Sequence, residues 1–253
     1  MFRNLLANLA VFSTSVMATV DYSEWDAAIN PWGYGYTAHE ITTSDGYILT
    51  TFRITEDAEG NALTPSMPPV VIMHGNSMDA STWLASQANN SDGVKPFQLM
   101  LADAGYDVYC ASNRGTVMSR QHTTLDVASQ EYWDFSWLEM GLYDVRANIE
   151  FAVSQSSFEK AFYIGYSQGT VQMFYSLAML ESEFHAANTY KVLAMAPCFE
   201  TSNALTYDLY AVAWGALASM GVYAVNGPNE TADQTTVCDA QGAACSWYTN
   251  LST

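Results

Sequence analysis

A serine bracketed by two glycines is the residue whose setting in this sequence best suits covalent chemistry. The segment Gly165-Tyr166-Ser167-Gln168-Gly169 has the spacing G-x-S-x-G and separates residues that favour a strand from residues that favour a helix. Such a turn strains the backbone at the serine, and the glycines two positions before and after it leave room for the chain to double back. Ser167 is therefore predicted to project its hydroxyl above a sheet and to act as the nucleophile in acyl transfer.

Two backbone N–H groups are predicted to stabilise the oxyanion that this chemistry produces. Gln168 begins the helix after the serine, so its N–H faces the carbonyl oxygen of a bound ester. Asn76 follows a β-branched run and belongs to the loop His74-Gly75-Asn76, in which the glycine allows close approach of the backbone. We expect the Asn76 N–H to be the second donor, and His74 to order this loop by hydrogen bonds without a catalytic role.

The sequence does not supply an evident base for the serine. After this kind of turn the usual chain order is Ser, then Asp or Glu, then His. The only histidine after Ser167 is His185, and only Glu181 and Glu183 are acidic residues between them. His185 is predicted to be a surface residue on the loop after a helix. The 253-residue chain is therefore expected to be nearly inactive by itself.

Alternating strands and helices are expected to position these groups. Strands are predicted at residues 70–73, 106–111, 160–166 and 191–196, with helices at 97–104, from 136 onward and at 168–180. This alternation indicates the α/β class, with a mostly parallel sheet covered by helices on both faces. Residues 36–54 alternate polar and apolar around the turn 44–46, which predicts an N-terminal antiparallel hairpin.

The helix that begins at Ser136 is supported by two patterns. Ser136 and Glu139 have capping-box spacing. Apolar residues then recur every three or four positions along one face: Leu138, Leu142, Val145, Ile149 and Val153.

Composition and charge limit the possible partners. Hydrophobic residues make up 49% of the chain, which favours one globular domain. The 26 Asp and Glu residues against 8 Lys and Arg residues give a net charge of -18, which would repel a phosphate backbone, so no nucleic-acid partner is expected. No run is long and apolar enough to span a bilayer.

Cysteine and histidine spacing gives no sign of a metal site. No C-x-x-C or paired histidine spacing occurs, so neither a metal nor a cofactor is expected. Cys110 and Cys198 lie in apolar segments and are predicted to be buried free thiols. Cys238 and Cys245 could close a short loop in an oxidising compartment.

The N-terminus suggests export. Residues 1–18 combine Arg3, an apolar stretch and small residues near Ala18, as in a secretory signal peptide. Three N-x-S/T sequons fit a secreted glycoprotein: Asn89, Asn229 and Asn250.

Several motifs follow one another along the chain: Asp45-Gly46-Tyr47-Ile48-Leu49 with Arg53-Ile54, residues 101–108, Asn113-Arg114-Gly115 with Ser119-Arg120, residues 132–136 with Tyr143-Asp144, and residues 165–170. In this order they make the chain, from about residue 30 to 197, resemble the acid lipases, a family that includes gastric and lysosomal forms. Two departures stand out, because the family usually has His where Tyr166 lies and Leu where Asn76 lies.

This resemblance implies an α/β-hydrolase fold, with the N-terminal part of the core at residues 19–199 and the start of a cap at 200–253. It implies Ser167 as nucleophile, the amides of Asn76 and Gln168 as oxyanion hole, and a cap disulfide between Cys238 and Cys245. The family's catalytic Asp and His would lie beyond residue 253, so the chain is expected to be truncated. The implied activity is hydrolysis of triacylglycerols or sterol esters at a lipid–water interface.

Two other classes of function remain open from the sequence. One is a noncatalytic lipid-binding relative that has lost its triad. The other is a different α/β-hydrolase, such as a peptidase or a small-ester esterase, which short and long acyl substrates would distinguish from a lipase.

Overall fold

The computed structural model describes residues 20–84, 94–179 and 182–197. Several sequence-based expectations lie outside these residues: the signal peptide at 1–18, the start of the cap at 200–253, and the residues Asn89, Cys198, Asn229, Cys238, Cys245 and Asn250. Cys110 is described, and it is a buried free thiol as predicted, with its pKa raised by burial to about 12.

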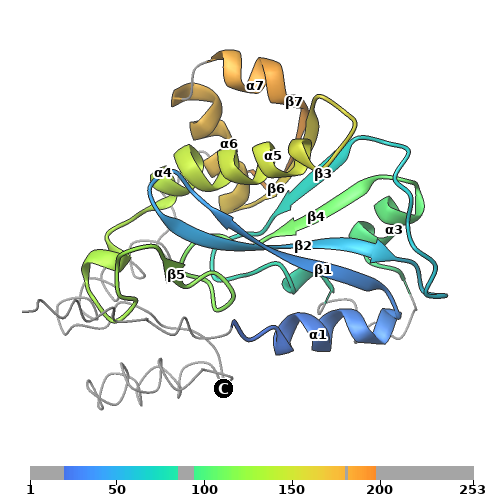
Figure 1. Cartoon of the computed structure of the whole chain (residues 1–253). Coiled ribbons are helices and arrows are strands. Elements are labelled where there is room, and N and C mark those ends of the chain that lie inside the picture. Colours follow the sequence, from blue (N-terminus) through green and yellow to red (C-terminus); the bar gives the residue numbers. More distant parts are fainter. Residues whose placement is uncertain (1–19, 85–93, 180–181, 198–253) are drawn as a thin grey trace, which may run out of the picture.

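In the described residues seven strands form one sheet, in the order β1-β2-β4-β3-β6-β7 with β5 paired to β2 (Figure 1). The strands are β1 (Gly35–Thr42), β2 (Tyr47–Glu56), β3 (Pro69–Met73), β4 (Asp107–Ala111), β5 (Gln121–His122), β6 (Ala161–Tyr166) and β7 (Thr189–Met195). β4, β3, β6 and β7 run parallel to one another, whereas β2 is antiparallel to β1, β4 and β5. The predicted hairpin and the parallel part of the sheet are both confirmed.

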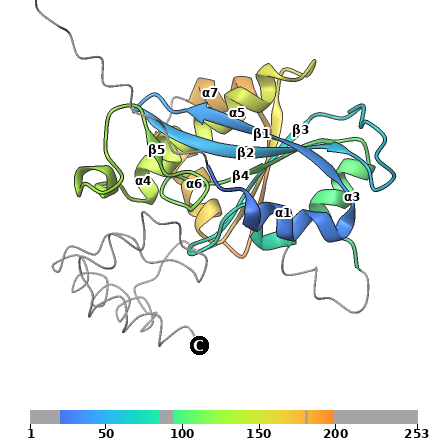
Figure 2. The same cartoon turned by 60° about the horizontal axis from the view of Figure 1, so that its bottom comes forward.

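Helices cover both faces of this sheet, as predicted. The α-helices are α1 (Ser23–Ile29), α3 (Phe97–Asp103), α4 (Trp137–Glu139), α5 (Val145–Ser154), α6 (Gln168–Met179) and α7 (Ser182–Asn188). Figures 1 and 2 show α1 and α3 on one side of the sheet and α5 and α7 on the other. No helix in the described part of the chain has the length and apolarity needed to cross a bilayer.

Strand β3 shows why two layers of helices are needed. Its alternate residues Val70 and Ile72 pack in a core with Trp25 and Leu99, from α1 and α3. Val71 and Met73 point the other way, into a core formed with α5, α6 and β6. Each fully buried side chain of this size contributes roughly 1.5–3 kcal/mol, so the central strand is stabilised from both faces.

The helix that begins at Ser136 is interrupted, which the apolar periodicity did not predict. Its capping box is confirmed, since the Ser136 N–H donates to Glu139 Oε2 at 2.8 Å. A π-helical segment, Met140–Asp144, then precedes α5. A Cβ at Gly141 would lie 2.7 Å from the carbonyl oxygen of Gln172, so this segment packs directly on α6. α5 then buries Val145 and Ile149, as the apolar periodicity predicted, together with Asn148 and Ala152.

Candidate active site

The loops that hold the candidate residues follow neighbouring parallel strands. In the register of the sheet Met73 of β3 lies beside Ala111 of β4 and Gly165 of β6. Because the carboxyl ends of parallel strands meet at one edge of a sheet, the loops after these three strands lie together. His74, Asn113 and Ser167 all belong to them.

Ser167 lies in a strained turn between β6 and α6. Its φ angle is 48°, in the left-handed region that non-glycine residues seldom adopt. The Ser167 N–H donates to the Met195 carbonyl at 2.9 Å, and the Ser167 carbonyl accepts from the Thr170 N–H at 2.9 Å. The strained conformation is therefore held by hydrogen bonds on both sides of the residue.

The two flanking glycines lie where no side chain fits. A Cβ at Gly165 would lie 2.6 Å from the carbonyl oxygen of Gly169. A Cβ at Gly169 would lie 2.8 Å from the carbonyl oxygens of both Met73 and His74. Because these neighbours are backbone atoms, they cannot move aside as the end of a side chain would.

The loop after β3 packs directly on this turn. A Cβ at Gly75 would lie 3.0 Å from Tyr166 Cδ1 and 3.2 Å from Ser167 Cβ. Asn76, the next residue, is exposed, and Gln168 is the first residue of α6. The structure thus brings the segment that contains Asn76 and the segment that contains Gln168 to the same serine.

His74 orders this loop by hydrogen bonds, as predicted. Its Nδ1 lies 2.8 Å from the Gly75 carbonyl oxygen, and its Nε2 accepts from the Asn113 N–H at 3.0 Å. The side chain is buried, and this burial lowers the pKa of His74 below its ordinary value.

The prediction for His185 was wrong. His185 lies on α7, which was not predicted, and it is only 5% exposed. Its Nε2 is 2.9 Å from Ser176 Oγ and its Nδ1 is 3.1 Å from Thr189 Oγ1. These hydroxyls come from α6 and β7, so the ring joins α7 to both elements, and burial lowers the pKa of His185.

All four histidines of the sequence are described, and none has a recorded hydrogen bond to the Ser167 hydroxyl within this part of the chain. Besides His74 and His185, His122 Nε2 lies 3.0 Å from the Asp45 carbonyl oxygen and the His39 ring lies 4.9 Å from the Phe151 ring. The candidate nucleophile therefore has the Gly75 loop beside it, but none of the four histidines is hydrogen-bonded to it in the described part of the chain.

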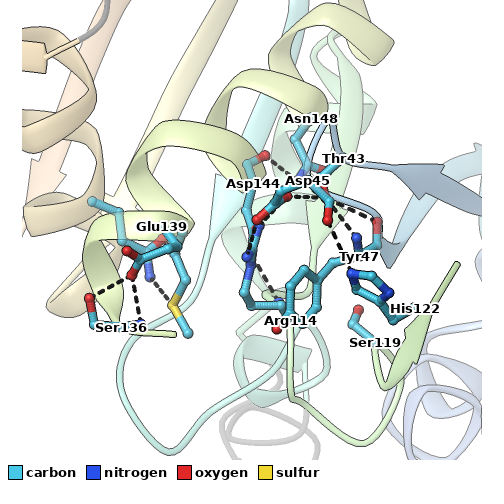
Figure 3. Close-up of polar contacts among 12 residues, drawn as sticks. Thr43, Asp45, Tyr47, Arg114, Ser119, His122, Ser136, Glu139, Asp144 and Asn148 are labelled. Atoms are coloured by element: carbon cyan, nitrogen blue, oxygen red, sulfur yellow. Dashed lines mark hydrogen bonds and ion pairs between the residues drawn. The ribbon is translucent and has the colours of Figure 1, made fainter. Parts of the chain in front are cut away.

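Sequence reasoning missed a second polar site near the same edge of the sheet, the Arg114 cluster, which comprises Arg114, Asp45, Asp144 and Tyr47. The Arg114 and Asp144 side chains are both 0% exposed, and Arg114 Nη2 lies 2.7 Å from Asp144 Oδ1. The guanidinium also forms a forked pair with Asp45, at 2.6 and 2.9 Å, and lies 4.0 Å from the Tyr47 ring centroid (Figure 3). Each of these residues occurs in a motif that carried the resemblance, which was the one signal in the sequence that could have indicated this cluster.

The charges in the Arg114 cluster depend on one another. Burial by itself would lower the pKa of Arg114, but the adjacent carboxylates raise it above its ordinary value. Burial raises the pKa of Asp144, and the Arg114 guanidinium opposes that shift. The cluster is therefore a buried ion network in which each charge needs its partner.

Comparison with known proteins identifies the family. A family model described as "alpha/beta hydrolase fold" matches residues 68–216, and one described as "Partial alpha/beta-hydrolase lipase region" matches residues 26–87. The chain belongs to the α/β-hydrolase fold family.

Its relatives include named lipases, which confirms the resemblance found in the sequence. Lipase member J of Homo sapiens is 39% identical over 175 residues, which cover 68% of this chain and 46% of that protein. Lysosomal acid lipase/cholesteryl ester hydrolase of Homo sapiens is 37% identical over 152 residues, covering 60% of this chain and 37% of that protein. Gastric triacylglycerol lipase of Rattus norvegicus is 34% identical over 187 residues, covering 68% of this chain and 46% of that protein. The chain spans less than half the length of these curated relatives.

Proposed function

We propose that this chain is the nucleophile-bearing part of a serine ester hydrolase. The Ser167 Oγ attacks the carbonyl carbon of a carboxylic ester, the alcohol leaves with a proton, and water then releases the acid from the acylated serine. The amides of Asn76 and Gln168 stabilise the tetrahedral oxyanion. The observation that carries the proposal is the left-handed Ser167 between β6 and α6, with the Gly75 loop packed against it.

The proposed substrates are triacylglycerols or sterol esters, taken from a lipid–water interface. The names of the gastric and lysosomal relatives support this substrate class. We further propose that the protein acts outside the cell or in the lysosomal lumen, as the expected signal peptide, sequons and disulfide suggest.

We also propose that the 253-residue chain alone reacts slowly, because none of its four histidines has a recorded bond to Ser167. Enzymes of this type that lose a triad residue still react about 10³–10⁴-fold faster than the uncatalysed reaction in water, because the oxyanion hole and substrate binding remain.

Covalent labelling tests the role of Ser167. A p-nitrophenyl alkylphosphonate is expected to form a bond from phosphorus to Ser167 Oγ and to release p-nitrophenolate, with peptide mass spectrometry locating the adduct. Ser167→Ala should abolish labelling, and Ser154→Ala, a change at an exposed serine of α5, should leave it unchanged. Equal labelling of wild type and Ser167→Ala would contradict the proposal.

The length of the alkyl group on the phosphonate probe distinguishes a lipase from a small-ester esterase. Faster labelling by long-chain than by short-chain phosphonates favours a lipase, and the reverse order favours a small-ester esterase. Binding to triacylglycerol emulsions without any labelling of Ser167 would favour the noncatalytic lipid-binding relative.

A further inference from the structure

The peptide group between Gly75 and Asn76 connects His74 to the proposed oxyanion hole. The carbonyl of this group is the Gly75 oxygen, which lies 2.8 Å from His74 Nδ1. Its N–H is that of Asn76, one of the two proposed oxyanion donors. The described chain has no cis peptide bonds, and in a planar trans peptide the C=O and N–H point in opposite directions. A contact that fixes the Gly75 carbonyl therefore also fixes the direction of the Asn76 N–H.

The hydrogen-bond partners of His74 define its tautomer. The Asn113 N–H can only donate, so the ring nitrogen that faces it at 3.0 Å, Nε2, must carry no hydrogen. The Gly75 carbonyl can only accept, so Nδ1 must carry the hydrogen. The neutral ring joins two backbone groups. Protonation of Nε2 would place two N–H donors opposite each other, that of the ring and that of Asn113.

Asn113, the far end of this bridge, is itself firmly held. Its carbonyl accepts from Thr116 Oγ1 at 2.8 Å. The next residue, Arg114, donates its backbone N–H to Asp144 Oδ2 at 2.9 Å and holds Asp45 and Asp144 with its guanidinium. The His74 ring is thus hydrogen-bonded to a loop that the Arg114 cluster holds in place.

We propose that His74 is a positioning residue of the oxyanion hole, which joins the Asn113 N–H to the Gly75 carbonyl and thereby sets the direction of the Asn76 N–H. This inference rests on the proposed function, because it assigns a purpose to the oxyanion donor. In this proposal His74 takes no part in proton transfer to or from Ser167. Burial of the ring lowers the pKa of His74, which favours the neutral form that the two backbone contacts require.

Three substitutions separate the two contacts of the ring. His74→Asn places an amide N–H near the position of Nδ1 and keeps the contact to Gly75, whereas His74→Gln places an amide oxygen near Nε2 and keeps the contact to Asn113. His74→Ala loses both. Loss of a whole oxyanion donor costs about 10²–10³-fold in rate, and a misdirected donor is expected to cost about 10-fold. The rate constant for phosphonylation of Ser167 should therefore fall about 10-fold in His74→Ala and His74→Gln, and stay within about 3-fold of wild type in His74→Asn.

Nuclear magnetic resonance of the whole 15N-labelled chain gives readouts that do not need a reaction. The long-range 1H–15N spectrum should show His74 with its hydrogen on Nδ1. The residual dipolar coupling of the Asn76 N–H should be retained in His74→Asn and averaged toward zero in His74→Gln and His74→Ala. Thermal unfolding of each variant controls for folding.

The outcomes are decisive in either direction. Hydrogen on Nε2, equal rate losses in all three variants, or an unchanged Asn76 coupling in His74→Ala would overturn the proposal. If wild type shows no labelling of Ser167, the proposed hydrolase function fails, but the tautomer and the Asn76 coupling still decide the role of His74.

Discussion

The serine turn and the Arg114 cluster lie at the same edge of the sheet, but different atoms hold them in place. At the serine turn, backbone atoms contact backbone atoms, and the glycines at 165 and 169 leave no space for even one additional carbon. In the Arg114 cluster, side-chain charges are neutralised inside the protein. The first region should therefore be sensitive to added atoms and the second to removed charges.

The largest expected effect is in the Arg114 cluster. Arg114→Ala leaves Asp144 buried without its partner, which should lower the free energy of unfolding by about 3–5 kcal/mol, measured by urea denaturation. Arg146→Ala is the matched control, because Arg146 pairs with Glu150 at 2.9 Å on the surface with 47% of its side chain exposed. That pair should contribute no more than about 0.5 kcal/mol. If both variants lost a similar free energy of unfolding, the buried ion network would stabilise the protein no more than an exposed ion pair does.

The next effect should come from a single methyl group in the serine turn. Gly169→Ala places a Cβ against the carbonyl oxygens of Met73 and His74, and the strain should lower the free energy of unfolding by about 1–3 kcal/mol. It should also slow phosphonylation of Ser167, because the turn must shift to accept the methyl group. Gly60→Ala is the control, since a Cβ there meets nothing within 4 Å, although its φ of 79° carries a conformational cost. If Gly60→Ala slowed labelling equally, the steric account of the serine turn would be wrong.

The smallest effect concerns a second buried site held by side chains, the ring of His185 with Ser176 and Thr189. Because burial depresses the pKa of His185 below 6.5, the unfolded chain binds this proton more readily than the folded chain does. The stability that the neutral ring contributes should be complete above pH 6.5 and lost as the pH falls through the folded pKa. Wild type should exceed His185→Gln by about 1 kcal/mol at pH 7.5, and the difference should shrink at pH 5. A difference that is independent of pH would contradict this, and labelling of Ser167 should not change.

The strands and the serine turn could be predicted because their determinants are local. β3 is a continuous apolar run buried on both faces, and the two glycines show directly where the chain must fold back on itself. His74 was also correctly predicted to order its loop, since a histidine beside a glycine at the end of a strand has backbone groups within reach.

Other features depend on contacts that sequence patterns do not contain. Gly141, in the π-helical segment, packs directly on α6, and the apolar period of the segment's own residues does not indicate this contact. The Arg114 cluster combines residues 45, 114 and 144, whose charges look like ordinary surface charges until the fold buries them. α1 and α7 have seven residues each and, unlike α3 with Gly105, no glycine just after the last turn to mark an end, so neither was predicted and His185 was assigned to a surface loop.

The hydrogen bond from the Ser167 N–H to the Met195 carbonyl makes the proposed nucleophile depend on a strand that lies 28 positions later in the chain. During synthesis, the turn around Ser167 leaves the ribosome before its β7 partner does. Even a fully formed β6 and α6 would leave that amide without its carbonyl until β7 joined the sheet. The backbone of the proposed nucleophile therefore gains its full set of hydrogen bonds only after β7 has joined the sheet.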